Sequence, residues 1–291
     1  MITILTPTYN RAHTLPQAYN SLCEQTCFDF EWIIVDDGSV DDTAQLVESW
    51  IRQESRFPII YLSQPNGGKH RAVNHGIRNA KAAYTLILDS DDFLTCDAVA
   101  TVHTWIESIS GLSGFAGVAG LKGWTSKEGA IGGTPNTEYI DATNTQRIHL
   151  GLMGDKAEIY KTALLREYPF PEFEGENFLR ESAVWDRLAL LGYKLRWYNK
   201  IIYKCEYLED GLTKANEFLR ALNNFQGYTY CAQLAVQVLP FLYKELRIGI
   251  YDHVATHKGK ISADVCRILN ISRFHLFLGR LVYRVHKAIR R

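Results

Sequence analysis

Three carboxylates stand within four positions of the sequence, directly after an apolar run. The run covers residues 84–88, and Asp89, Asp91 and Asp92 follow it. Like charges this close repel one another, and burying them unpaired costs free energy. A turn followed by a helix cap would leave them in water, whereas a divalent cation such as Mn²⁺ or Mg²⁺ would convert the repulsion into coordination. The segment alone leaves both interpretations open.

The elements around this segment alternate between strand and helix patterns over the first hundred residues. Asp42, with Gln45 three positions later, is typical of a capping box at the start of a helix. This alternation predicts βαβ units, and hence an α/β fold with a Rossmann-like, mostly parallel sheet flanked by helices. The expected strands are 2–6, 31–35, 59–62 and 84–88. The expected helices are about 14–24, 42–52 and 97–107, with one more that follows the two glycines of the segment 66–83.

Each of the four predicted strands ends in a polar segment. In chain order these segments read TPTYNR, DDGS, QPNGGKH and DSDD. Ligands of open α/β sheets bind outside the carboxyl ends of the strands. Four polar ends at one edge of a sheet favour a binding site there over four unrelated turns.

The remainder of the chain predicts further strands and then a helical extension. The Gly-rich stretch 111–133 is expected to add strands to the sheet, and the pattern is mainly helical from about residue 219. We therefore expect an α/β domain over 1–215 and a mainly helical extension over 216–291. The last segment, 273–291, is amphipathic and basic, so it could lie on an anionic membrane surface or pack with a solvated basic face.

Composition narrows the class of protein. Lys plus Arg equal Asp plus Glu at 32 each among 291 residues, which argues against a nucleic-acid partner. The six cysteines form no CxxC pair, a pattern that suits reduced thiols. The chain opens directly into a strand-like run rather than a signal peptide, and it has no apolar run of about 18 residues. These features predict a cytoplasmic protein.

Taken in order, five elements of the sequence resemble glycosyltransferase family 2. They are TPTYNR, VDDGS, NGGKHRAVNHGI, LDSDD, and an acid four residues before a helix tryptophan, here Glu181 and Trp185. The resemblance covers roughly residues 1–205. It implies the GT-A fold, a nucleotide-sugar donor, a divalent cation and transfer with inversion.

The resemblance also implies roles for individual residues in binding the donor. It makes Asp92 the metal ligand, with Asp91 on the ribose or the metal and Asp89 bracing the loop. An acid of the DDGS segment, Asp36 or Asp37, would accept a hydrogen bond from the imide of uracil, and the sequence leaves open which one.

Two further segments complete the expected donor site. By the same resemblance, Thr8 and Tyr9, with Pro7 shaping the backbone, would form the opposite wall of the base pocket. Gly67 and Gly68 stand where backbone turns tightly or approaches a ligand, and Lys69 could place a positive charge near phosphate. A Gly-rich turn with a solvated lysine is the alternative for this segment.

Glu181 is the candidate general base, because transfer needs a group that removes the proton of the acceptor hydroxyl. The family has an acid pair before the tryptophan, whereas this chain has Arg180 and Glu181. Glu174 and Glu176 could compete for the role, and an acid favoured by the helix dipole is the structural alternative for Glu181.

The function predicted from these residues is a metal-dependent, inverting glycosyltransferase. The donor would be a UDP-sugar, and the acceptor a glycan or lipid-linked glycan in cell-surface polysaccharide synthesis. Two rivals stay open: a non-catalytic member that binds nucleotide-sugar or glycan in an assembly, and a sugar nucleotidyltransferase. The sugar, the linkage and the oligomeric state stay open as well.

Overall fold

The chain separates into two compact units in the computed structural model, which describes residues 1–206 and 216–289. The first unit consists of Met1–Pro169 and Leu191–Tyr207, and the second of Phe170–Leu190 and Leu208–Arg291. Both units are therefore discontinuous in sequence. The domain boundary predicted between residues 215 and 216 borders 207–215, which lie outside the described residues.

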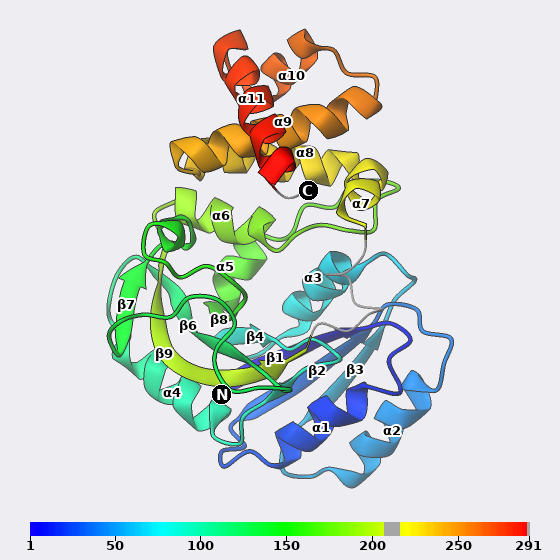
Figure 1. Cartoon of the computed structure of the whole chain (residues 1–291). Helices are drawn as coiled ribbons and strands as arrows, with labels where there is room; N and C mark the ends of the chain where they lie inside the picture. Colours follow the sequence, from blue (N-terminus) through cyan, green and yellow to red (C-terminus); the bar gives the residue numbers. More distant parts are fainter. Residues whose placement is uncertain (207–215, 290–291) are drawn as a thin grey trace. The chain divides into compact units, whose positions relative to one another are not determined.

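A nine-stranded sheet forms the centre of the first unit (Figure 1). The strands are β1 (Ile2–Thr8), β2 (Phe30–Asp36), β3 (Ile59–Ser63), β4 (Tyr84–Ile87), β5 (Phe93–Leu94), β6 (Phe115–Trp124), β7 (Tyr139–Ala142), β8 (Lys156–Lys161) and β9 (Lys194–Cys205). Their order is β3-β2-β1-β4-β8-β6-β9-β5, and β7 pairs with β9. The N-terminal strands match the four predicted ones to within one or two residues.

Parallel pairing is confined mainly to the N-terminal half of the sheet. Strands β3, β2, β1 and β4 are all parallel, as the βαβ pattern predicts. In the other half, β8 runs antiparallel to both β4 and β6, and β5 and β7 run antiparallel to β9, while β6 and β9 are parallel. Antiparallel neighbours need no helical crossover, so this half lacks the alternation that reveals parallel strands in a sequence.

Helices flank this sheet and supply much of its core. They are α1 (Leu15–Cys23), α2 (Thr43–Gln53), α3 (Lys69–Asn79), α4 (Ala98–Ser108) and α5 (Thr162–Glu167), with one 3₁₀ helix, η1 (Asn144–Ile148). All seven residues of β1 and of β2 are buried, as expected for parallel strands covered on both faces. Tyr19 of α1 stacks on Trp50 of α2 with ring centroids 4.3 Å apart, and Trp32 of β2 lies against both rings.

The capping box predicted at Asp42 does not form. Asp42 occupies the N-cap position of α2, but its side chain makes no capping hydrogen bond. Asp41 takes the role instead, because its carboxylate accepts from the Thr43 backbone N–H at 3.1 Å and from the Thr43 hydroxyl at 2.5 Å. The Asp41 carboxylate also accepts from the Ala12 N–H at 3.0 Å. This contact with a loop distant in sequence favours Asp41 over Asp42 as the capping residue.

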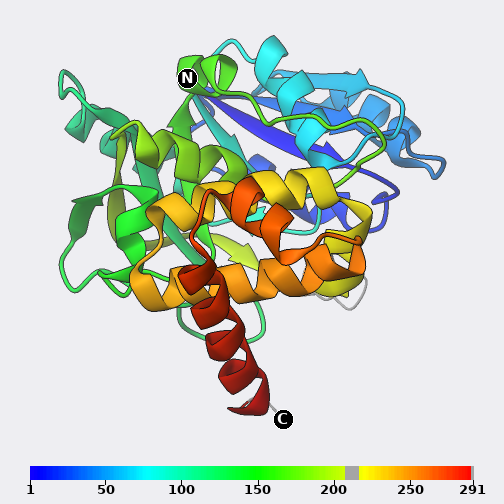
Figure 2. The same cartoon turned by 90° about the horizontal axis from the view of Figure 1, so that it is seen from above.

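Among the residues described, the second unit consists of an irregular segment over 170–181 and six helices, and its C-terminal part is mainly helical as the sequence predicts. Its helices are α6 (Ser182–Leu190), α7 (Glu217–Asn223), α8 (Phe225–Val238), α9 (Phe241–His257), α10 (Ser262–Leu269) and α11 (Arg273–Ile289). Helices α8 and α9 lie side by side (Figure 2). Tyr251, Ile248 and Leu276 are among the buried residues of its separate small core. No helix in the described part of the chain is both long and apolar enough to cross a membrane.

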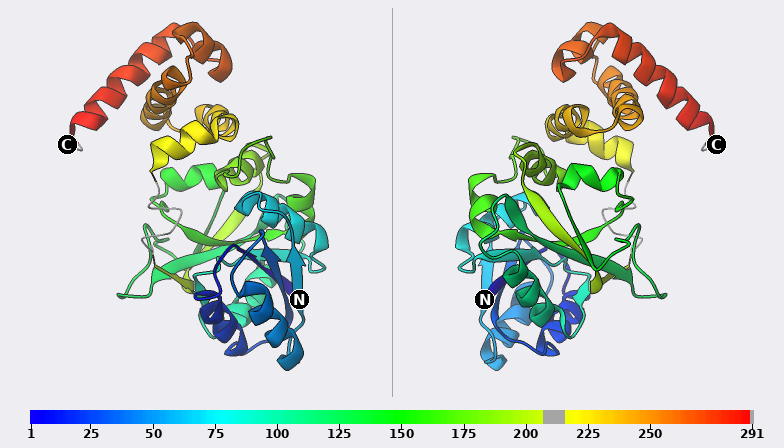
Figure 3. Two further views of the ribbon diagram at one scale, coloured as in Figure 1. Left: turned by 90° about the vertical axis from the view of Figure 1, so that its right-hand side faces the viewer. Right: turned by 90° about the vertical axis from the view of Figure 1, so that its left-hand side faces the viewer.

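Helix α11, the continuous terminal helix in Figure 3, is held against α9 by two polar side-chain contacts on either side of a close backbone approach. A Cβ added at Gly249 would lie 2.1 Å from the Gly279 carbonyl oxygen, so the two helices meet where neither has a side chain. On one side of this point His275 Nδ1 lies 2.5 Å from the fully buried Glu245 carboxylate. On the other, Arg280 makes two bonds of 2.8 Å to Asp252. These contacts, which extend from His275 to Arg280, hold the first half of α11 against α9.

Candidate functional site

The carboxyl ends of β1, β2, β3 and β4 lie along one edge of the sheet, because these four neighbours are parallel. The four polar segments singled out in the sequence therefore stand next to one another. Direct contacts join them: the Asp37 N–H donates to the Thr8 carbonyl at 2.8 Å, and the Gln64 N–H donates to the Asp36 carbonyl at 3.0 Å. This edge is the candidate site.

Asp37 holds the glycine loop that precedes α3. Its carboxylate accepts from the Gly67 N–H at 2.9 Å, from the Gly68 N–H at 2.7 Å and from the Gln64 side-chain amide at 2.7 Å. Gly68 is the N-cap of α3 and has a φ of +95°, which other residue types rarely adopt. The structure thus brings Asp37, Gly67 and Gly68 together. The two glycines contribute through their backbone N–H groups, both of which donate to the Asp37 carboxylate.

Asp36 faces a different set of partners. Its carboxylate accepts from the Ser39 N–H at 2.7 Å and from the Tyr61 hydroxyl at 2.6 Å. Burial and this carboxylate raise the pKa of Tyr61 above its ordinary value, so the phenol stays a donor. Both Asp36 and Asp37 are buried and hydrogen-bonded, and each retains acceptor capacity for one more donor.

The predicted opposite wall of the base pocket begins inside β1. Pro7 and Thr8 are its last two residues, and Tyr9 follows with an exposed side chain. The Thr8 hydroxyl is buried and has no hydrogen-bond partner among the residues that the structure describes. Because buried hydroxyls are normally paired, this one marks a place where a ligand would complete the bonding.

The three aspartates after β4 are compensated by two lysines. Lys69, the first residue of α3, places its ammonium nitrogen 2.5 Å from Asp89 Oδ1. Lys122 of β6 lies 3.9 Å from both Asp89 Oδ2 and Asp92 Oδ2. The turn-and-cap interpretation is therefore insufficient, because Asp92 is buried and shares a counter-ion with Asp89 instead of lying in water.

The ionisation of the three carboxyls reflects this crowding. Burial and the neighbouring Asp89 charge raise the pKa of Asp92 to about 7. The same two causes raise the pKa of Asp91. Burial also acts on Asp89, but the charges of Lys69 and Lys122 hold its pKa below the ordinary value. Asp91 and Asp92 carry negative charge at a cost, which a bound cation would relieve.

The donor set fits a hard divalent cation that is shared with a ligand. Carboxylate oxygens are the ligands that Mg²⁺ and Mn²⁺ prefer, and Asp91 and Asp92 provide them. No group of three or more acidic, histidine or cysteine side chains in the described part of the chain could hold a metal by itself. A cation here would take its remaining ligands from phosphate oxygens and water.

Lys122, Tyr203 and Cys205 belong to this cluster, but sequence reasoning missed them. The Lys122 ammonium lies 4.0 Å from the centroid of the Tyr203 ring, and the Tyr203 hydroxyl accepts from the Asp89 N–H at 2.9 Å. Burial, followed by the Asp92 charge, raises the pKa of Cys205 to about 12. A lone lysine inside the otherwise uncharged strand 115–124 was the available signal, since such a charge needs a partner.

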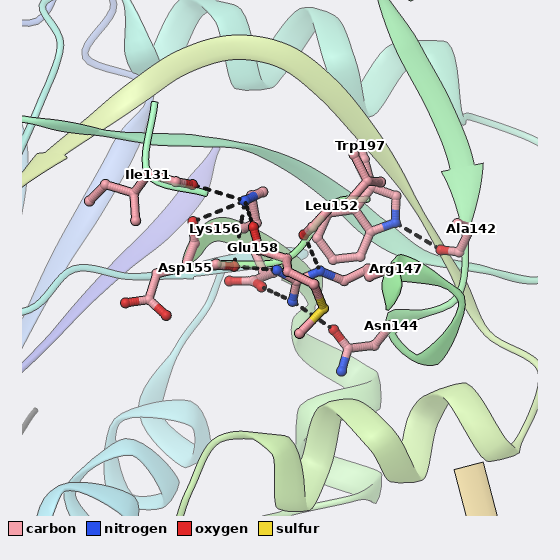
Figure 4. A network of polar contacts seen from close by, with 11 residues as sticks. Ile131, Ala142, Asn144, Arg147, Leu152, Asp155, Lys156, Glu158 and Trp197 are labelled. Atoms are coloured by element: carbon pink, nitrogen blue, oxygen red, sulfur yellow. Dashed lines mark hydrogen bonds and ion pairs between the residues drawn. The ribbon is translucent and has the colours of Figure 1, made fainter. Parts of the chain in front are cut away.

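A second polar network in this unit shapes the loop before β8 (Figure 4). The buried Lys156 ammonium donates to backbone carbonyls that include those of Ile131 at 3.2 Å and Met153 at 3.1 Å. Burial, and then the charge of Arg147, lowers its pKa to about 8. Arg147 donates to the Leu152 carbonyl at 3.1 Å and lies over the Trp197 ring. The side chain of Lys156 is thus committed to holding backbone.

The candidate base, Glu181, belongs to the second unit. Its carbonyl accepts from the Val184 and Trp185 N–H groups at 3.0 and 3.2 Å, so it directly precedes the first turn of α6. Glu174 is exposed. Glu176 is used structurally, because its carboxylate accepts from the Gln226 and Gly227 N–H groups at 2.6 and 2.8 Å at the start of α8.

Comparison with known proteins agrees with this arrangement. Residues 3–112 match the model of the family described as Glycosyl transferase family 2. Glycosyltransferase GlyG of Streptococcus pneumoniae serotype 4 is 30% identical over 107 residues, which are 37% of this chain and 35% of that protein. This chain spans about a third or less of the curated relatives that it matches first.

Solved structures share the fold over nearly the whole chain. TarS 1–349 of S. aureus in complex with UDP-GlcNAc superposes with a TM-score of 0.65 at 17% identity, covering 99% of this chain and 91% of that one. The mannosyltransferase PcManGT of Pyrobaculum calidifontis, in complex with GDP-Man and Mn²⁺, gives 0.57 at 16% identity, covering 98% and 86%. The expected α/β class is confirmed, with a GT-A-like sheet, and residues 3–112 of the chain match the model of glycosyltransferase family 2.

Proposed function

We propose that this chain transfers a sugar from a UDP-sugar to a hydroxyl of a glycan or lipid-linked acceptor, with inversion, in cell-surface polysaccharide synthesis. One observation carries the proposal. The region that matches the family, residues 3–112, contains all four polar strand ends, and these lie side by side with the acidic turn at one edge of the sheet.

The donor nucleotide is assigned to the N-terminal strand ends. A carboxylate of Asp36 or Asp37 accepts the imide N–H of uracil, and the unpartnered Thr8 hydroxyl with Pro7 and Tyr9 lines the other side of the base. TarS, which shares the fold, has been solved with UDP and with UDP-GlcNAc. A buried carboxylate discriminates in favour of a base that can donate a hydrogen bond.

The diphosphate is assigned to the acidic turn and its lysines. Asp92 and Asp91 would hold Mn²⁺ or Mg²⁺, which as a Lewis acid supplies stabilisation of the charge on the leaving diphosphate. Lys69 and Lys122 lie on Asp89 at 2.5 and 3.9 Å and place two positive charges beside the same turn. Asp89 positions these ammonium groups, and Gly67 and Gly68 let backbone approach the phosphates.

Glu181 is assigned as the general base. It removes the proton from the acceptor hydroxyl while that oxygen attacks the anomeric carbon in line with the departing nucleoside diphosphate. The capping role of Glu176 and the exposed position of Glu174 favour Glu181 among the three glutamates. One displacement with one base inverts the anomeric centre.

Calorimetric titration of UDP in Mn²⁺ and then in EDTA tests the proposal. We expect binding that requires Mn²⁺ and is lost in Asp92→Ala, and release of UDP from a UDP-sugar that is lost in Glu181→Gln while UDP still binds. Binding of UDP without turnover of any UDP-sugar, with or without glycan acceptor, would instead favour a non-catalytic binding protein. Release of pyrophosphate would favour a nucleotidyltransferase. Absence of UDP, GDP and dTDP binding would overturn the donor site.

We also propose that α11 lies on an anionic membrane surface. Its exposed apolar side chains recur at helical spacing and form one stripe, namely Phe274, Phe277, Leu281 and Val285. Arg273, Arg284 and Lys287 are exposed along one border of this stripe, and residues 273–291 contain no acidic residue. A basic border beside an exposed apolar stripe suits anionic headgroups, whereas it would repel a second copy of itself.

A further inference from the structure

A cavity of about 200 Å³ lies within the helical unit. Its lining comes from the start of α6 and the residues before it, and from α7, α8 and α9. Most of the surface is apolar, with Leu179, Ala232 and Leu239 among its contributors. The sheet-edge site described above does not use any of these residues, and no role has been assigned to the cavity.

Three arginines from three different segments converge on this cavity. Arg180 precedes α6, Arg220 lies in α7 and Arg247 lies in α9. Arg180 forms an ion pair with Glu217, and the Arg220 guanidinium lies 4.3 Å from the centroid of the Phe178 ring. Arginines brought from separate helices to one concave surface are the arrangement that recognises phosphate or carboxylate.

The positive charges are not fully balanced by the acids of the lining. The lining contains three arginines and two acids, Asp186 and Glu217, which leaves one positive charge in excess. Burial, and then the charges of Arg247 and Arg220, lowers the pKa of Arg180 below its ordinary value. The guanidinium groups therefore disfavour one another, and a bound anion would relieve this.

One polar group of the lining, the Tyr228 hydroxyl, lacks a hydrogen bond to the described part of the chain. The buried Tyr228 hydroxyl lies beside the Arg247 guanidinium, but it makes no hydrogen bond of ordinary geometry with any described residue. Buried hydroxyls are normally satisfied. A ligand oxygen that accepts from the Tyr228 hydroxyl would complete its bonding beside the Arg247 guanidinium.

We propose that this cavity binds a phosphate ester carried by a partly apolar molecule, and that this ester belongs to the acceptor. The second half of the statement rests on the proposed function, because Arg180 directly precedes the assigned base, Glu181. The guanidinium groups and the Tyr228 hydroxyl bind the phosphate oxygens, and the apolar lining contacts the adjoining carbon chain.

Titration calorimetry of the whole chain with n-octyl phosphate below its critical micelle concentration tests the cavity. We expect saturable binding that Arg247→Met weakens about 10- to 100-fold, the loss typical of charged hydrogen bonds. The matched control is Arg267→Met, which removes an exposed arginine of α10 and should leave binding unchanged. If Arg247→Met does not fold, Arg247→Lys replaces it in the test. This variant keeps the positive charge but not the planar guanidinium, so we expect an intermediate loss of octyl phosphate binding.

Other probes give the outcomes that would overturn the proposal. Octanoate binding as tightly as octyl phosphate would refute the phosphate assignment, and octyl phosphate binding equally to wild type and Arg247→Met would refute the site. UDP titration on the same samples separates the two proposals. If octyl phosphate binds but UDP does not, the cavity stands and the transferase proposal fails; if UDP binds but octyl phosphate does not, the reverse holds.

Discussion

The ammonium nitrogen of Lys69 lies 2.5 Å from Oδ1 of Asp89, and this ion pair joins the first residue of α3 to the turn after β4. The same helix start is held from the other side by Asp37 through Gly67 and Gly68. The glycine loop is therefore fixed between two acidic segments before any ligand arrives. A site held in this way has little entropy left to lose when a ligand binds.

Asp92→Asn should make the protein more stable at about pH 8. Burial and Asp89 raise the pKa of Asp92 to about 7 from an ordinary 3.8. The folded chain thus binds this proton more tightly than the unfolded chain, and the associated stability is full below about pH 4 and lost as the pH rises through 7. The variant should gain on the order of 1–3 kcal/mol at about pH 8 over wild type.

Urea unfolding of both proteins at about pH 4 and pH 8 measures this difference. The gain should shrink toward zero at the lower pH, where wild-type Asp92 is protonated. A gain of equal size at both values would mean that the asparagine helps for another reason.

Glu176→Gln and Glu181→Gln should separate stability from activity. Glu176 accepts two backbone N–H groups at the start of α8, so its substitution should lower the free energy of unfolding by about 1 kcal/mol. Glu181→Gln should instead lower the transfer rate by about 10²–10⁴-fold with an unchanged thermal midpoint. Transfer rates at saturating UDP-sugar and thermal unfolding curves of both variants show which glutamate contributes to stability and which to activity. Full activity in Glu181→Gln would remove it as the base.

Lys156→Met should destabilise the protein increasingly at alkaline pH. Burial and Arg147 lower the pKa of Lys156 to about 8 from 10.5, so the folded chain holds this proton less tightly than the unfolded chain. Wild-type stability therefore contains a contribution that rises between about pH 8 and 10.5 and is absent from the variant. The lost bonds to backbone carbonyls should cost about 1–3 kcal/mol in addition. Denaturant titrations of wild type and Lys156→Met across this pH range measure both contributions to the free energy of unfolding. A difference in this free energy that does not change with pH would contradict the lowered pKa.

Gly249→Ala should destabilise the helical unit even though alanine favours helices. By propensity alone the substitution would stabilise by about 0.5–1 kcal/mol. The added Cβ, however, would lie 2.1 Å from the Gly279 carbonyl and 2.6 Å from Tyr283 Cβ, so α9 and α11 must separate. A net loss of about 1–3 kcal/mol is expected. Chemical denaturation reports the sign, and a stabilised variant would show that the helices do not meet at these glycines.

Membrane contact by α11 can be measured by co-sedimentation with vesicles. The whole chain should bind vesicles of phosphatidylcholine and phosphatidylglycerol in equal parts, and binding should fall in high salt and without phosphatidylglycerol. Phe277→Ser with Leu281→Ser should abolish it, whereas Leu112→Ser, at an exposed leucine of the first unit, should not. If light scattering shows a dimer that only the double variant loses, and vesicles do not bind, the stripe covers a second copy instead.

The sequence predicted the N-terminal strands well because each is a short apolar run ended by a polar turn and followed by an amphipathic helix. Strands were expected within 111–133, where β6 lies, but the order and pairing of the mixed half escaped prediction, because β7 and β8 follow loops and β6 pairs with β9 across some 80 residues. Lys122 and Tyr203 reach the acidic turn only through that pairing. Local spacing could identify the three aspartates, but it could not identify Lys122 as the counter-ion that Asp89 and Asp92 share.

The discontinuity of the two units has a consequence for biosynthesis. Strand β9, which pairs with β5, β6 and β7, is the last of the described strands to be made, and residues 170–190 of the helical unit precede it. A nascent chain that has released only the first 169 residues therefore exposes the unpaired edges of three strands. The sheet can close only after residue 205 has left the ribosome, and the segment carrying Glu181 must then wait for α7, α8 and α9. Truncation near residue 215 would thus leave that segment without the helices it packs against.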